Sequence, residues 1–105
     1  MKGSDLMEMS EKEKAVLTII PTGSEKPIKG AIICEKTGLS RRVMQETIAD
    51  LITKHHAKIG AIRKGKETGY YIIQNKADLE MAVRPLRAQV KRMAERINIL
   101  ESEKW

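Results

Sequence analysis

The sequence predicts an α+β fold in which three helices and a small β-hairpin are followed by one long C-terminal helix. Three observations predict it. Two short helical segments are separated by Gly38-Leu39-Ser40, which combines a helix stop with a helix start. Two segments of β-branched and aromatic residues flank a basic, glycine-bounded turn over residues 63–69. Apolar residues then recur at heptad spacing over residues 79–100.

The length of 105 residues allows one domain and an appendage, but not two ordinary domains. We divide the chain into a flexible leader over residues 1–9, a globular domain over residues 10–75 and a C-terminal dimerisation helix over residues 76–105. Phe is absent, so the core must be built from Ile, Leu, Val and Met.

The net charge is +6, and most of it lies in the middle of the chain. Residues 27–75 carry nine basic and four acidic groups, a net charge of +5. Residues 1–26 carry a net charge of −1 and residues 76–105 a net charge of +2. A positive field on the middle segment is typical of a domain that binds a polyanion.

The cysteine count and the hydropathy pattern predict a cytoplasmic protein that does not bind a membrane. Cys34 is the single cysteine, which excludes an internal disulfide and fits a reducing compartment. No apolar run approaches transmembrane length, and the polar N-terminus has no signal-peptide core.

The first helix is expected to begin after Ser10, because Ser10 and Glu13 have the spacing of a capping box. We expect its buried face to consist of Ala15, Val16, Ile19 and Ile20. Residues 27–29 are expected to be a short extended segment, and residues 30–37 a second helix that ends at Gly38.

The third helix, expected from Ser40 to Lys54, carries the main functional signal. Ser40 is placed to cap it, and two arginines follow in its first turn, where the helix dipole favours acidic residues. Met44, Ile48 and Leu51 share one face and are expected to pack inward. The opposite face keeps polar side chains, namely Arg41, Arg42, Gln45 and Glu46. A helix that is buried on one side and polar on the other has the layout of a DNA recognition helix.

After this helix, we expect a strand over residues 57–62 and a second strand over residues 69–73. Two strands around a cationic turn, directly after a recognition helix, form a wing. Its basic side chains, Arg63, Lys64 and Lys66, can reach phosphates or the minor groove.

The C-terminal segment is expected to be one helix from Lys76 to about Glu103, with a heptad seam. The a positions are Val83, Val90 and Ile97, and the d positions are Leu79, Leu86, Met93 and Leu100. β-Branched residues at a with leucine at most d positions favour a parallel pair of helices. We therefore expect a homodimer, or a tetramer if a second apolar face (Ala82, Ala94 and Ile99) is also used. Pro85 is expected to kink this helix or to mark where its regular part begins.

The order of these elements resembles the winged helix-turn-helix domain of the biotin-operon-repressor type. The resemblance covers residues 10–73 and includes the closing step Gly69-Tyr70-Tyr71-Ile72. It implies DNA binding through the third helix and the wing, at Ser40, Arg41, Arg42, Gln45, Glu46, Lys64 and Lys66. Biotin repressors continue into a ligase domain, which this chain lacks, so no small-molecule effector is implied. Small proteins of this build resemble those encoded by bacteriophages and mobile elements of Gram-positive bacteria.

Nothing in the sequence predicts catalysis, a metal or a cofactor. Residues 60–67 differ at one position from the phosphate-binding loop pattern, because Glu67 stands where that loop needs Ser or Thr. His55 and His56 are adjacent, which rarely suits chelation of one ion, and are expected to be solvated at a helix end. No Ser/His/Asp or paired-carboxylate arrangement stands out.

The sequence therefore predicts a dimeric, sequence-specific double-stranded DNA-binding protein. It would act as a transcriptional regulator or origin-binding protein of a phage or mobile element. The alternative is an adaptor that docks on a host replication or transcription factor through the wing and the coiled coil. The charge distribution favours DNA. Glu46 on the reading face is the contrary feature, although glutamate can accept a hydrogen bond from cytosine N4.

Overall fold

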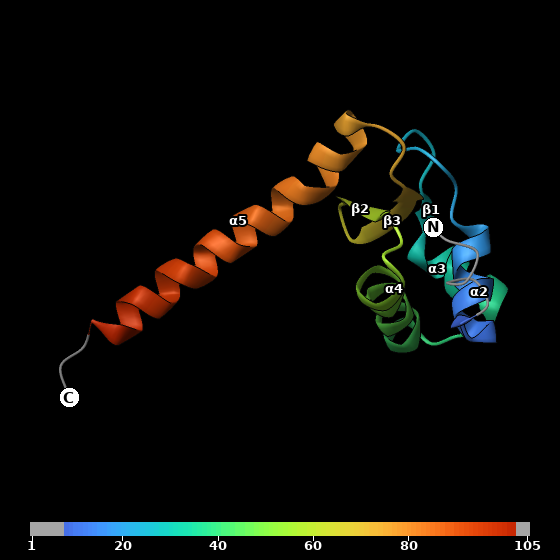
Figure 1. Ribbon diagram of the computed structural model, residues 1–105, viewed down its shortest axis with the longest axis horizontal. Helices are drawn as coiled ribbons and strands as arrows, with labels where there is room; N and C mark the ends of the chain where they lie inside the picture. Colours follow the sequence, from blue (N-terminus) through green and yellow to red (C-terminus); the bar gives the residue numbers. More distant parts are fainter. Residues whose placement is uncertain (1–7, 103–105) are drawn as a thin grey trace.

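The computed structural model describes residues 8–102. The elements follow in the order α2 (Glu11–Ile19), β1 (Ile28–Lys29), α3 (Gly30–Thr37), α4 (Arg41–His55), β2 (Ile59–Lys64), β3 (Glu67–Ile72) and α5 (Lys76–Glu101). The strands form one antiparallel sheet in the order β1-β3-β2. Helices α2, α3 and α4 gather beside this sheet, whereas α5 extends far away from it (Figure 1). The predicted α+β class and the long C-terminal helix are confirmed.

Helix α2 starts as the sequence predicts. Ser10 Oγ accepts a hydrogen bond from the Glu13 amide at 3.1 Å, and Glu13 Oε1 accepts one from the Ser10 amide at 2.9 Å. Val16 is buried, but Ala15 is exposed, so its predicted place in the core was wrong. Met9 is also buried in the core, which shortens the predicted leader by at least this residue. Residues 1–7 of that leader lie outside the described part of the chain.

The connection between α3 and α4 also has the predicted local chemistry. Gly38 takes a left-handed conformation, with φ of 75°, and its amide bonds the Cys34 carbonyl at 2.8 Å. Ser40 Oγ accepts from the Val43 amide at 3.2 Å and so caps α4. Met44, Ile48 and Leu51 are buried as expected. Thr47, which the apolar pattern misses, is buried too, and its hydroxyl donates a hydrogen bond to the Val43 carbonyl.

The β2–β3 hairpin is longer and its turn shorter than predicted. The turn consists of Gly65 and Lys66 alone, with Lys64 paired to Glu67. Gly65 has φ of 63°, which a two-residue hairpin with glycine at its first turn position requires. The predicted seven-residue turn over residues 63–69 was wrong because the ladder continues through exposed polar residues. Such residues carry no burial pattern from which strand pairing could be read.

The two faces of the sheet are covered differently. Tyr70 and Ile59 join the core that the sheet shares with α2, α3 and α4. Tyr71 points to the opposite face, which we call the outer face, and its hydroxyl bonds the Asp78 carbonyl in the first turn of α5 at 3.1 Å. The Tyr71 ring is fully buried, and it passes so close to Gly60 that a Cβ there would lie 2.6 Å from the ring. The start of α5 is therefore packed on the outer face.

Helix α5 is continuous through Pro85, which removes one backbone hydrogen bond without ending the helix. From Arg84 to the end of the helix all side chains are exposed. Helix α5, like every other helix in residues 8–102, is too short or too polar to cross a membrane.

One histidine is not solvated as predicted. His55 Nε2 lies 3.3 Å from Glu13 Oε1, and both side chains are nearly buried between α4 and α2. His56, by contrast, is exposed and closes α4 in a left-handed conformation, with φ of 57°. No local pattern predicts the Glu13–His55 contact, because the two residues are 42 positions apart in the sequence.

Replacing Glu13 with Ala should lower the free energy of unfolding by about 1–2 kcal/mol, because α2 loses half of its capping box.

The Ser10 amide, and secondarily His55, hold the pKa of Glu13 below its ordinary value of 4.5. A lowered pKa stabilises the fold above pH 4.5, and this stabilisation is lost as the pH falls through the folded-state pKa. Glu13→Gln should therefore flatten the acid limb of stability against pH, measured by urea unfolding. Exposed Glu11→Gln is the control, and a limb equally steep in both variants would contradict the assignment.

Candidate nucleic-acid interface

The N-terminal half of α4 presents the predicted polar face to solvent. Arg41, Arg42, Gln45 and Glu46 are all exposed, while the opposite side of the helix is buried in the core. The remaining predicted residue, Ser40, uses its hydroxyl to cap the helix. Its contribution to a site is therefore the placement of the two arginines that follow it.

The two arginines differ in their surroundings. Arg42 Nη1 lies 2.7 Å from Glu46 Oε1, one turn further along α4. Both side chains are more than half exposed, so this pair adds little stability, but it orients Arg42 and offsets its charge. Arg41 has no ion-pair partner within residues 8–102. The full positive charge of Arg41 is therefore open to an anionic ligand.

Arg41 lies next to the hairpin. It lines a small hollow together with Lys29, Gly30, Ala31, Thr68 and the acid Glu67, which is itself paired with Lys29. Burial is the main cause of the raised pKa of the Tyr70 phenol, and the positive charge of Arg41 acts in the opposite direction. Thr68 is the cross-strand partner of Arg63, which brings a second cation to the edge of the same surface.

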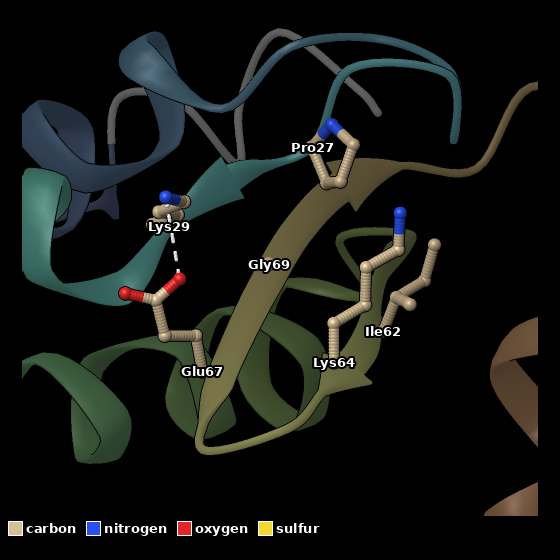
Figure 2. A pocket seen from close by; sticks show the side chains of 6 residues that line it. All are labelled: Pro27, Lys29, Ile62, Lys64, Glu67 and Gly69. Atoms are coloured by element: carbon tan, nitrogen blue, oxygen red, sulfur yellow. Dashed lines mark ion pairs between the residues drawn. The ribbon is translucent and has the colours of Figure 1, made fainter.

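The three predicted hairpin cations do not share one face. Arg63 pairs with Thr68 and alternates with Lys64, so it lies on the sheet face turned toward α4. Lys66 is at the tip of the turn. Lys64 lies on the outer face, where it lines a shallow hollow of about 200 Å³ with Ile62 and Pro27 (Figure 2). Arg41, Arg63 and Lys66 form what we call the basic edge, and Lys64 lies outside it.

Sequence reasoning missed Lys29. Its Nζ lies 3.3 Å from Glu67 Oε2 and so ties β1 to the turn end of the hairpin (Figure 2). Lys29 also precedes α3 as its N-cap but provides no side-chain hydrogen bond to the first amides of the helix. Uncapped amides beside Arg41 are a suitable place for a phosphate oxygen. The available signal was a lysine where Ser, Thr, Asp or Asn usually caps a helix.

The predicted heptad seam is largely bare. Val83 is half-buried, and the other six members are exposed, with Val90 at 66% and Leu100 at 63%. The start of α5 lies near the sheet, but the rest of the helix leaves the domain (Figure 1). The domain therefore does not cover its own seam.

A hollow of about 450 Å³ between α2 and the ends of β2 and β3 has a mixed lining, with Leu17, Ile20 and Ile73 beside Thr22, His56 and Lys58. No group of three or more His, Cys, Asp or Glu side chains in residues 8–102 could hold a metal ion.

Comparisons of the chain with family models, with curated proteins and with solved structures found no match. The resemblance to the biotin-operon-repressor type therefore rests on the motifs and on the order of the elements.

Proposed function

We propose that this chain is a winged helix-turn-helix protein that binds double-stranded DNA sequence-specifically as a homodimer. In this reading, α3 and α4 form the helix-turn-helix, α4 is the recognition helix and the β2–β3 hairpin is the wing. The observation that carries the proposal is the basic edge. Arg41 at the start of α4 lies against the hairpin that carries Arg63 and Lys66, and Glu67, the acid of that hairpin, is paired with Lys29.

The exposed face of α4 has side chains suited to read base edges. Arginine grips guanine O6 and N7 with two donors, and glutamine pairs with adenine in the same way. Arg41 and Gln45 are four residues apart on the same side of the helix and can meet neighbouring base pairs. Arg42, held by Glu46, is suited to a phosphate or to a guanine whose partner cytosine donates to Glu46.

Pairing of α5 supplies the dimer. The exposed seam is an apolar stripe that a second copy of the chain would bury. In a parallel pair, Arg96 at g faces Glu101 at e of the next heptad in the partner. In a fully overlapping antiparallel pair, Glu80 would instead face Glu101 of the partner, and the two acids repel. The charges thus favour the parallel pair.

The biological role that fits best is a transcriptional regulator or an origin-binding protein of a phage or mobile element, with no small-molecule effector. Selection of bound sequences from a pool of random duplexes tests the proposal. Enrichment of one motif with two related halves is the expected result. Retention of the whole pool without enrichment would indicate non-specific binding. No retention at low salt would overturn DNA binding and leave the adaptor as the better reading.

The double substitution Arg63→Ala and Lys66→Ala should weaken binding to all duplexes about equally. Two lost phosphate contacts should flatten the slope of log affinity against log salt by roughly 2 units. Lys64→Ala is the control from the same hairpin, because Lys64 lies on the outer face and should change the slope less. An unchanged slope for the double variant would place the wing away from DNA.

A further inference from the structure

The contacts between the globular domain and the first turn of α5, which we call the joint, centre on one buried residue, Asp78. This side chain is only 4% exposed, and Asp78 is the one fully buried residue of α5. Its Oδ1 accepts from Ser24 Oγ at 2.6 Å, and its Oδ2 accepts from the Gln74 amide at 3.2 Å. Its own amide donates to Asn75 Oδ1 at 2.8 Å, and its carbonyl accepts from the Tyr71 hydroxyl.

These hydrogen bonds exceed what is needed to start a helix. Asn75 alone caps α5, and an acid in the first turn complements the helix dipole without further partners. Ser24, however, belongs to the loop between α2 and β1 and lies 54 residues away in the sequence. Its bond to Asp78 adds nothing to helix initiation. It ties the helix start to a second, separate part of the domain.

The contacts of Tyr71 restrict the same joint from the side of the sheet. The ring is fully buried on the outer face and touches Gly60, and its hydroxyl holds the Asp78 carbonyl. Burial is the main cause that raises the pKa of Tyr71, so the phenol stays protonated and can donate this bond. Three segments, namely the Ser24 loop, β2 with β3, and the start of α5, are thus locked together.

We propose that Asp78 is a positioning residue that fixes the direction of α5 relative to the DNA-binding domain and thereby sets the spacing of the two half-sites. The inference rests on the proposed function, because the seam that pairs two copies lies beyond this joint. A flexible joint would let the two DNA-binding domains of a dimer sample many separations. The gain in affinity from binding the second half-site would then be spread over many half-site spacings. A locked joint concentrates that gain at one spacing and one face of the duplex.

The test uses the full chain and duplexes that carry two copies of the selected half-site. Their separation is varied in single base pairs over about one helical turn, roughly 10 base pairs. The wild type should show one sharp optimum. Asp78→Ala should lower the affinity at that optimum about tenfold and flatten the profile, with unchanged affinity for a single half-site. Ser24→Ala, which removes one bond only, should do the same to a smaller extent, and exposed Glu80→Gln is the control.

A flat profile for the wild type would overturn the inference, as would sharp profiles for both joint variants. Ser24→Ala keeps the test valid if Asp78→Ala does not fold.

A second measurement needs no DNA. With Cys34→Ser and a spin label at Lys66→Cys, the distance between the two hairpin tips of a dimer should be narrowly distributed, and Ser24→Ala should broaden it. A narrow distribution in a protein that binds no duplex would show that the proposed function has failed while the joint is rigid. A broad one in the wild type would show that the joint itself is flexible.

Discussion

Replacing both Val90 and Ile97 with Asp is expected to produce monomers whose globular domain remains folded. The two side chains are 66% and 54% exposed and lie on the part of α5 whose residues are all exposed, so the substitution removes no contact from the core. In the paired helices the same positions would be buried, and like charges facing each other there without partners oppose association strongly. The variant should keep weak binding to a single half-site. It should lose most of the gain on the full site, which for linked contacts is on the order of 10²–10⁴.

Sedimentation of the wild type and the variant measures this directly. A matched control is available on the same helix, because Ala88→Asp with Asn98→Asp makes the same change in net charge at exposed positions outside the seam. That control should stay dimeric and bind the full site almost as well as the wild type. A wild type that sediments as a monomer at micromolar concentration would contradict the proposed dimer. A tetramer would keep the seam but require a second apolar face, for which Ala94 and Ile99 are exposed.

The helix ends of this domain could be predicted because their chemistry is local. Ser10 and Glu13 cap each other three residues apart, and Gly38 and Ser40 stop one helix and start the next within three residues. The buried face of α4 followed from the helical period. The joint at Asp78 could not be predicted, because Ser24 and Asp78 meet only when the whole sheet is assembled. In sequence, Asp78 looked like an ordinary acid in a first helical turn.

The candidate site was predictable on α4 and only partly on the hairpin. On a helix the face of a side chain follows from its number, so the exposure of Arg41 and Arg42 could be read in advance. On a hairpin the face depends on the register, and a shift of one residue exchanges the two sides. The tight turn at Gly65 decides that Arg63, and not Lys64, faces α4. No pattern in the sequence distinguished these two cations.

Arg41→Ala is expected to weaken binding to the preferred duplex by about 1–3 kcal/mol, as for the loss of a two-donor contact to guanine. The effect should exceed that of Arg42→Ala, because Arg42 already shares its charge with Glu46 at 2.7 Å. Titration against the preferred and a scrambled duplex separates the possibilities. A loss confined to the preferred duplex indicates base reading, and an equal loss on both indicates a phosphate contact. No loss on either would remove Arg41 from the interface. Lys12→Ala, an exposed cation on α2, controls for the change in net charge.

Glu46→Ala, which removes both the charge and the acceptor oxygens, then tests how α4 uses its one exposed acid on the reading face. If Glu46 only orients Arg42, its neutralisation frees a cation and removes repulsion from phosphates, so affinity for every duplex should rise. If Glu46 accepts a hydrogen bond from cytosine N4, affinity for the preferred duplex should fall while affinity for the scrambled duplex rises. We expect the second result, because Arg42 and Glu46 at this distance can read a guanine and its cytosine as one unit. Equal affinities of variant and wild type on both duplexes would place this pair outside the interface and leave Arg41 and Gln45 as the reading residues.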